Sequence, residues 1–107
     1  MDVPSALDKH AAQLSALGHP ARLQALRFVV QGDPNGTAAG DIQSHVDLPA
    51  STLSHHLKRL ADSDLVVART EGTFIYYRAN YAALRNLTTY LWEDCCKRGK
   101  GKSKECC

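Results

Sequence analysis

The sequence predicts a mainly α-helical domain with one β-hairpin, in the order α-α-α-α-β-β-α, on three observations. Apolar residues recur at helical spacing through residues 5–62 and again after Asn80. Clusters of Gly, Pro and Asn, such as residues 32–36, separate the helical stretches. Between the two helical parts, two runs rich in β-branched and aromatic residues flank Glu71-Gly72, which is typical of a hairpin.

The first two helices are defined by their terminal residues. Ser5, with Asp8 three residues later, is typical of a helix N-terminus, and Gly18 ends this helix. Pro20 favours the first turn of a second helix, where its missing N–H costs nothing. We expect the buried face of the second helix to comprise Leu23, Leu26, Phe28, Val29 and Val30.

A third and a fourth helix are expected on either side of a tight turn at residues 47–49. The third covers about residues 38–46, with Thr37 as its N-cap, and the fourth begins at about Ala50. Its apolar positions are Leu53, Leu57, Leu60 and Ala61. Its other face has hydrogen-bonding or cationic side chains and no carboxylate before Asp62: Ser51, Thr52, Ser54, His55, His56, Lys58 and Arg59.

The hairpin strands are predicted over residues 65–70 and 73–78. Asn80 can cap a last helix over about residues 81–97. Its apolar stripe contains Leu84, Leu87 and Leu91, and four residues further along this stripe is Cys95. The sequence therefore places Cys95 and the adjacent Cys96 on the last turn of this helix.

Composition restricts the class of protein. A chain of 107 residues forms one domain, which we expect over residues 1–97, followed by a flexible Lys/Gly-rich tail over residues 98–107. No apolar run approaches the ~20 residues that span a bilayer, and the N-terminus has no signal-peptide pattern. We therefore expect a cytoplasmic protein without membrane contact, whose thiols stay mostly reduced.

Charge is distributed unevenly along the chain. Residues 1–96 contain eight Lys and Arg against ten Asp and Glu, whereas residues 97–107 contain five against one. Residues 1–96 are therefore not a generally basic nucleic-acid binder, and any contact with DNA must come from a local basic face of the domain.

A short helix, a tight turn and a polar-faced helix together indicate a helix-turn-helix, whose second helix enters the major groove of DNA. A hairpin directly afterwards can act as a wing, with Arg69 or Arg78 near phosphate. The order therefore predicts a winged helix-turn-helix DNA-binding domain. The alternative is that residues 51–59 are only a solvated helix face, and the following hairpin favours DNA binding.

Three segments of the chain resemble the ArsR/SmtB family of metal- and metalloid-responsive winged-helix repressors. They are LSALGHPARLQALRFV (14–29), LPASTLSHHLKRLADSDLV (48–66) and RTEGTFIYYRA (69–79). The resemblance implies a homodimer held mainly by the first and last helices. It also implies binding to an inverted repeat in double-stranded operator DNA, and release when an inducer binds.

The resemblance also assigns roles on the fourth helix by position. Ser51, Thr52, Ser54 and His55 would face base edges, and His56, Lys58 and Arg59 would face bases or phosphates. The chain departs from the family where many members have a Gln, because this position is Ala50, and Pro49 replaces the usual cap. Base specificity would then depend on His55 and on DNA shape.

All four cysteines lie at the end of the chain, as Cys95-Cys96 and Cys106-Cys107. One inducer site common in the family uses cysteines at the start of the third helix, where this chain has Ala38-Ala39-Gly40. Another uses Asp, His and Glu on the last helices, but no histidine follows His56. The four C-terminal thiolates are the remaining ligand set.

Thiolates select soft ions, and three of them suit As(III) or Sb(III), whereas four suit Zn(II) or Cd(II). The sequence therefore predicts a repressor that releases DNA when As(III) or Sb(III) binds Cys95, Cys96 and a tail cysteine. A thiol redox sensor and a Zn/Cd/Pb/Hg sensor that uses the same cysteines are alternatives. A third alternative is a small dithiol enzyme or metal carrier. The sequence shows no nucleophile–base pair and no phosphate-binding loop, so we do not expect an enzyme.

Overall fold

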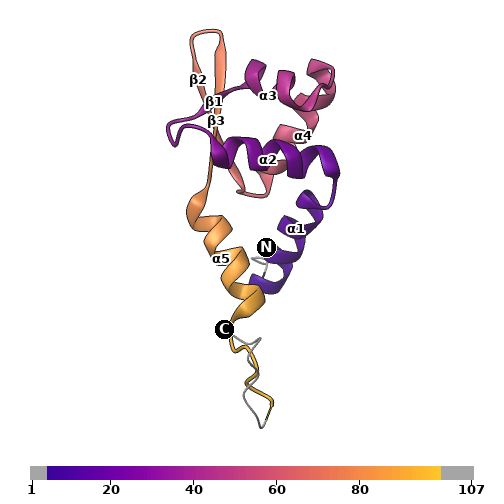
Figure 1. The fold of residues 1–107 in the computed structure, drawn as a ribbon, viewed down its shortest axis with the longest axis vertical. Coiled ribbons are helices and arrows are strands. Elements are labelled where there is room, and N and C mark those ends of the chain that lie inside the picture. The colour runs from indigo at the N-terminus through magenta and orange to yellow at the C-terminus, as the bar shows by residue number, and fades with distance from the viewer. Residues whose placement is uncertain (1–4, 100–107) are drawn as a thin grey trace.

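The computed structural model describes residues 5–99. The elements, in chain order, are α1 (Ala6–Leu17), α2 (Pro20–Gln31), β1 (Thr37–Ala38), α3 (Ala39–Val46), α4 (Ala50–Asp62), β2 (Val66–Glu71), β3 (Phe74–Ala79) and α5 (Tyr81–Trp92). The predicted order is confirmed, with the short strand β1 added. Helices α2, α3 and α4 pack with the hairpin in one half of the molecule, and α1 and α5 form the other half (Figure 1). No helix within residues 5–99 is long and apolar enough to cross a membrane.

The predicted starts of α1, α2 and α5 are confirmed. The Ser5 side chain accepts a hydrogen bond from the backbone N–H of Asp8 at 3.1 Å, and the Asn80 side chain accepts one from that of Ala83 at 3.2 Å. Pro20 occupies the first turn of α2. These local caps satisfy N–H groups that a helix leaves unpaired at its start.

The core lies between α2, α3, α4 and the hairpin. Its largest fully buried apolar side chains are Val29, Ile42, Leu57, Leu60 and Leu65. The apolar side predicted for α4 is confirmed, since Leu53, Leu57 and Leu60 are all buried. The prediction for α2 is wrong at its margins, because Leu23 and Val30 are 45% and 40% exposed. These two residues are seven positions apart and so share a side of α2 that is about 100° or more from the buried Ala25 and Val29, with Leu26 between the two sides.

Strand β1 replaces the predicted helix cap at Thr37. Thr37 and Ala38 pair with Tyr77 and Tyr76 along one edge of β3, which gives a three-stranded sheet in the order β1-β3-β2. Helix α3 starts after Ala38 without a side-chain cap. A two-residue strand has no sequence pattern of its own, and its paired residues are 38 and 40 positions away, so local signals do not reveal it.

The hairpin turn is shifted by one residue from its predicted position. Glu71 pairs with Phe74, so Gly72 and Thr73 form the two-residue turn. Gly72 has a φ of +62°, a conformation that costs glycine little. The glycine therefore begins the turn, and Glu71 belongs to β2.

Helix α5 is shorter than predicted and ends at Trp92 instead of Lys97. Glu93 has a ψ of 145°, and a series of turns follows, with hydrogen bonds from Cys95 N to Trp92 O and from Lys97 N to Asp94 O. Two carboxylates, on Glu93 and Asp94, oppose helix extension because they meet the negative end of the helix dipole. Cys95 and Cys96 therefore lie in the turns beyond α5 and do not continue its apolar stripe.

Candidate nucleic-acid interface

Helix α4 is fixed by its buried leucines and presents its polar side to solvent. Asp47 adopts a left-handed conformation, with a φ of 54°, and ends α3, so that the chain turns within three residues into α4. On α4 the predicted residues Ser51, Thr52, Ser54, His55, Lys58 and Arg59 are exposed, and His56 is half-buried. The exposed polar surface that base reading needs is therefore present, on the second helix of a helix-turn-helix.

The seven predicted residues on α4 fall into two stripes, since successive residues are about 100° apart around a helix. One stripe, which we call the outer stripe, comprises Ser51, Ser54, His55 and Lys58. The other, the inner stripe, comprises Thr52, His56 and Arg59. The outer stripe has one ion pair of its own, between Lys58 Nζ and Asp62 Oδ2 at 3.0 Å.

The inner stripe contacts the first two helices. The His56 ring lies 4.5 Å from the His19 ring, and its Nδ1 is 3.3 Å from Arg22 Nη1. Arg59 Nη2 donates to Ser15 Oγ at 3.4 Å. The structure thus brings the outer stripe together on the free surface of α4, whereas it uses His56 and Arg59 partly to hold α4 against α1 and α2.

The surroundings of His56 favour its neutral imidazole. Burial lowers its pKa below the ordinary histidine value, and the nearby His19, Arg22 and His55 lower the pKa further. Because a guanidinium only donates, His56 Nδ1 is the acceptor of the bond from Arg22 and cannot carry the proton. Arg22 also donates through Nε to Ala16 O at 2.5 Å, so it joins the end of α1 to α4.

The two predicted wing arginines lie on the same face of the hairpin but differ in their contacts. Arg69 is opposite Tyr76 and Arg78 is opposite Val67 in the strand register. Arg69 forms an ion pair with Glu71, donates to Asn35 O at 3.2 Å and places its guanidinium 4.7 Å from the centre of the Tyr76 ring. Arg78 is exposed. Arg69 therefore fastens the hairpin to the loop before β1, and Arg78 is the better placed of the two for phosphate.

An exposed aromatic side chain beside the hairpin turn escaped the sequence reasoning. Phe74 is 62% exposed and Ile75 is 41% exposed. The signal that could have found Phe74 is its position directly after the turn residues Gly72 and Thr73, because side chains there extend beyond the body of the domain. An apolar side chain at a wing tip can contact sugar or base edges in a minor groove.

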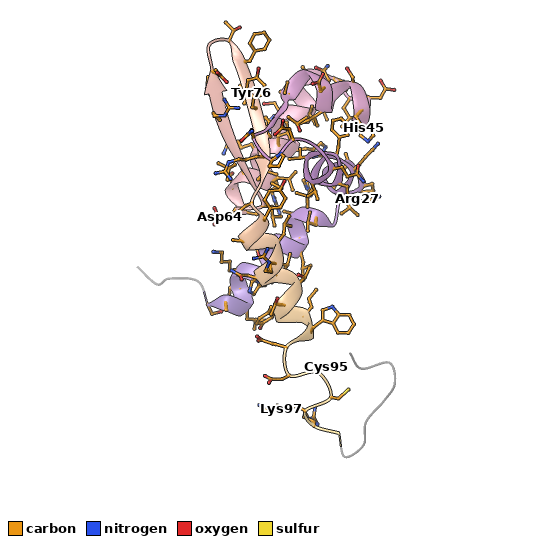
Figure 2. The ribbon with its side chains drawn as sticks, turned by 60° about the vertical axis from the view of Figure 1, so that its left-hand side comes forward. Arg27, His45, Asp64, Tyr76, Cys95 and Lys97 are labelled. Atoms are coloured by element: carbon orange, nitrogen blue, oxygen red, sulfur yellow. The ribbon has the colours of Figure 1, made fainter. Side chains whose placement is uncertain are left out.

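The cysteine pair lies far from this surface. Cys95 lies on the segment beyond α5, at the opposite end of the molecule from Tyr76 on the wing and His45 on α3 (Figure 2). Cys95 and Cys96 are exposed, and their Sγ atoms are 3.7 Å apart. Two sulfur atoms bound to one ion by ~2.3 Å bonds at a tetrahedral angle would be about 3.8 Å apart. The pair therefore fits a shared thiophilic ion.

The complete predicted ligand set cannot be placed. Cys106 and Cys107 lie outside the described residues, as does nearly all of the predicted tail. Within residues 5–99, no three His, Cys, Asp or Glu side chains are grouped as a metal site. The described part of the chain thus contains two of the four predicted ligands, Cys95 and Cys96.

The fold and the polar face of α4 define a DNA-binding winged helix-turn-helix protein. Residues 17–69 match the family described as "Helix-turn-helix domain". The arsenical resistance operon repressor of Bacillus subtilis (strain 168) is 32% identical over 104 residues, which cover 94% of this chain and 92% of that protein.

Two solved structures resemble the whole domain. One is the homodimeric winged helix-turn-helix DNA-binding domain Mb0332 from Mycobacterium bovis, a possible ArsR-family regulator. It is 27% identical in sequence, with a TM-score of 0.66, and the match covers 96% of this chain and 100% of that chain. The other is the repressor BigR from Xylella fastidiosa, which is 29% identical with a TM-score of 0.61. The match covers 76% of this chain and 82% of that chain. The chain belongs to the ArsR/SmtB family of transcriptional repressors, as its three sequence segments predicted. It is a regulator and not an enzyme.

Proposed function

We propose that this chain is a homodimeric repressor that binds an inverted-repeat operator through α4 and releases it when As(III) or Sb(III) binds its C-terminal cysteine thiolates. The observation that carries the proposal is the 3.7 Å spacing of the exposed Cys95 and Cys96 sulfur atoms, directly beyond α5. The likeness to an arsenical resistance operon repressor over almost the whole chain supports the choice of ion.

DNA contact is assigned to the outer stripe of α4 and to Arg78. Ser51, Ser54 and His55 can form hydrogen bonds with base edges, and Lys58 and Arg78 can contact phosphate. Thr52 and Arg59 lie beside the outer stripe and would contact the flanking backbone. His56 and Arg69 contribute mainly by holding α4 and the wing in position, because their side chains already have partners within the chain.

Dimer formation is assigned to α1 and α5. Leu7 and Leu14 on α1 are 62% and 43% exposed, and Leu91 and Trp92 on α5 are 59% and 61% exposed. Large apolar side chains grouped in this way mark surfaces that a partner covers. A second copy of the chain is the proposed partner, as in the homodimeric Mycobacterium bovis relative.

Release follows from the position of the cysteines next to this dimer surface. Cys95 N donates to Trp92 O at 3.1 Å, so an ion held by both sulfur atoms fixes the turn that immediately follows Leu91 and Trp92. Reordering that turn changes how α5 meets the partner and therefore how far apart the two α4 helices lie. A coupling of about 1–3 kcal/mol between ion and operator would produce substantial release.

The third ligand is assigned to Cys106 or Cys107, which follow Cys96 by ten and eleven residues in the sequence. Lys97 and Arg98 follow Cys96 directly, and their positive charges would offset the negative charge of a multi-thiolate site. A third thiolate gives the pyramidal set that suits As(III), and a fourth would give the tetrahedral set that suits Zn(II) or Cd(II).

Thiol oxidation is the second candidate trigger, because exposed cysteines beside cationic residues are reactive. One experiment separates the triggers. The reduced protein, bound to labelled operator, is titrated with arsenite, antimonite, Cd(II), Zn(II) and peroxide. Release by arsenite at concentrations where peroxide has no effect supports the proposal. Release by peroxide alone, or by Cd(II) or Zn(II) but not arsenite, would reject As(III) as the inducer.

A further inference from the structure

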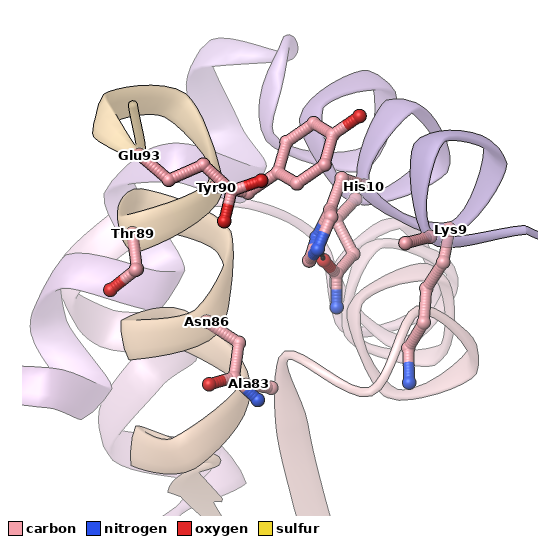
Figure 3. A pocket seen from close by; sticks show the side chains of 9 residues that line it. Lys9, His10, Ala83, Asn86, Thr89, Tyr90 and Glu93 are labelled. Carbon is pink, nitrogen blue, oxygen red and sulfur yellow. Dashed lines mark hydrogen bonds between the residues drawn. The ribbon is translucent and has the colours of Figure 1, made fainter. Parts of the chain in front are cut away.

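A pocket of about 430 Å³ opens between α1 and α5, and neither DNA binding nor the cysteine pair uses it. Figure 3 shows His10 from α1 and Tyr90 and Glu93 from the end of α5 around the same space. Gln13 lies at its inner side and is only 2% exposed, and Asn86 contributes a further polar group. The volume is within the range of about 300–1,000 Å³ that is usual for small-molecule sites.

The pocket adjoins the helix sides that carry the exposed apolar residues assigned to the dimer. On α1, Gln13 is about 120° from Leu7 and 100° from Leu14 around the helix, whereas His10 is only about 60° and 40° from these two leucines. On α5, Asn86 lines the pocket and is about 140° from Leu91 around the helix. A partner on the apolar side therefore borders the pocket at His10, while Gln13 and Asn86 lie on the sides of α1 and α5 that are directed away from that partner.

The hydrogen bonds of Gln13 fix the proton of His10. Gln13 Nε2 donates to Ser63 O at 3.1 Å, so the amide oxygen Oε1 is the atom directed toward His10 Nδ1, at 2.9 Å. An amide oxygen only accepts, so His10 Nδ1 must carry a proton. In the neutral imidazole, His10 Nε2 is then a hydrogen-bond acceptor.

The charges around the pocket favour a cation. The Glu93 carboxylate is a second acceptor, and the faces of Tyr90 and His10 lie 4.5 Å apart, centre to centre, beside it. Lys9 also borders the pocket, but its ammonium is 3.8 Å from Asp64 Oδ2 and points away from Glu93 (Figure 3). The Lys9 charge is therefore offset, and Glu93 is left as the dominant charge near the aromatic ring.

We propose that this pocket binds a small organic cation, a primary ammonium or a guanidinium, between the Glu93 carboxylate, His10 Nε2 and the ring of Tyr90. The cation donates to both acceptors, and its charge meets the carboxylate and the electron-rich face of the tyrosine. Its alkyl part occupies the space lined by Ala6 and Ala83.

A ligand in this position links the helices assigned to dimer formation with α4. It bridges α1 to the end of α5. His10 is hydrogen-bonded to Gln13, and Gln13 in turn donates to the carbonyl of Ser63, the C-cap residue of α4. Occupation of the pocket therefore constrains α4 relative to α5. An effect on operator affinity rests on the proposed function, whereas binding of the cation does not.

The probes are butylammonium and butylguanidinium, with 1-butanol and butyrate as uncharged and anionic controls of similar size. Each is added to the reduced full-length protein, and backbone amide shifts are followed by NMR. We expect saturable shifts at Asn86, Thr89 and Tyr90 for the two cations only. Glu93→Gln should weaken binding by about tenfold or more, because it removes the charge but keeps the shape of the side chain.

Asp94→Asn is the matched control, since it removes the neighbouring carboxylate, which does not line the pocket. Asp94 has a φ of 57°, which asparagine tolerates. The thermal midpoint of each variant is measured first, so that misfolding is not mistaken for lost binding. Equal binding of butanol, equal loss in Asp94→Asn, or wild-type affinity in Glu93→Gln would overturn the site.

A second measurement tests the link to α4. Operator affinity is measured with and without saturating butylammonium, in wild type and in Gln13→Leu. A change in wild type that is lost in Gln13→Leu supports the link through Ser63. If the cation binds and operator affinity stays constant, the link is rejected but the site is not. If the protein does not bind operator at all, the proposed function fails while the NMR result still decides the site.

Discussion

Gln13 on α1 reaches the end of α4, where its side-chain amide donates to the backbone carbonyl of Ser63 at 3.1 Å. The amide is almost fully buried, and its oxygen is bonded to His10 in turn. One polar side chain thus connects the helix assigned to dimer formation with the helix assigned to DNA. Buried polar groups of this kind fix one arrangement of the elements around them because every alternative leaves an unpaired group.

Gln13→Ala should destabilise the domain by about 1–3 kcal/mol, because it leaves the Ser63 carbonyl without its donor and opens a gap beside α5. Urea unfolding followed by circular dichroism measures the change in free energy of unfolding. Gln24→Ala, on the exposed side of α2, is the matched control and should lie close to wild type. A similar loss in both variants would show that the buried amide has no special role.

Stability should decrease as the pH falls below about 6.5, the ordinary histidine value, because burial lowers the pKa of His56 in the folded state. Between the folded and unfolded pKa values, the unfolded chain binds more protons, so protonation favours unfolding, and the contribution is constant above that window. Urea unfolding at a series of pH values measures this slope. His56→Gln should flatten it, while His55→Gln should retain most of it; an unchanged slope in His56→Gln contradicts the assignment.

Arg78→Ala should weaken operator binding about equally for all sequences and reduce the slope of log affinity against log salt by about 1, as expected for the loss of one phosphate contact. Fluorescence anisotropy across a salt series measures both. In Arg69→Ala the main effect should be faster hydrogen exchange in β2 and β3, since that side chain fastens the hairpin. If Arg69→Ala instead reduced the salt slope and Arg78→Ala instead sped hydrogen exchange in the hairpin, the roles assigned to the two arginines would be reversed.

Leu91→Glu should shift the protein toward the monomer, because a charge on this exposed apolar side of α5 cannot be buried against a partner without a large cost. Sedimentation velocity over a range of protein concentrations measures the equilibrium. Phe74→Glu is the control, since Phe74 is similarly exposed but lies on the wing. A dimer unaffected by Leu91→Glu would place the interface elsewhere.

Cys95→Ser and Cys96→Ser should each abolish release of operator by arsenite while leaving operator affinity without arsenite unchanged. Loss of either sulfur removes half of the pair that is proposed to anchor the ion directly beyond α5, so the ion no longer fixes that turn, whereas α4 is far from the pair (Figure 2). Of Cys106→Ser and Cys107→Ser, at least one should keep part of the response if a single tail thiol completes the set. Release equal to wild type in the Cys95 and Cys96 variants would refute the cysteine site.

The features that the sequence predicted correctly depend on short-range order. Ser5 and Asn80 cap helices through residues three positions away, and Gly72 produces the hairpin turn within four residues. Leu53, Leu57 and Leu60 are buried because their spacing follows the helical period. The family resemblance followed from these elements in their order. Each of these signals is contained in a window of a few residues.

The features that were missed depend on contacts between distant segments. The local sequence pattern groups His56 and Arg69 with the DNA-contacting residues. In the structure, however, His56 contacts Arg22 and Arg69 contacts Asn35, each 34 positions earlier in the chain. The end of α5 was overestimated because apolar periodicity continued to Cys95, while the charges of Glu93 and Asp94 ended the helix. Periodicity identifies a helix side more reliably than a helix end.

The sequence by itself determined the order of helices and strands, the polar side of α4 and the restriction of all four thiols to the end of the chain. Only the tertiary structure decided which polar residues of α4 remain at the free surface, and that Cys95 and Cys96 form a pair beyond α5. It also decided that His10, Tyr90 and Glu93 meet around one pocket. The physical reason is that propensity and capping act over one or two turns, whereas desolvation and hydrogen bonding between helices depend on how the whole chain packs.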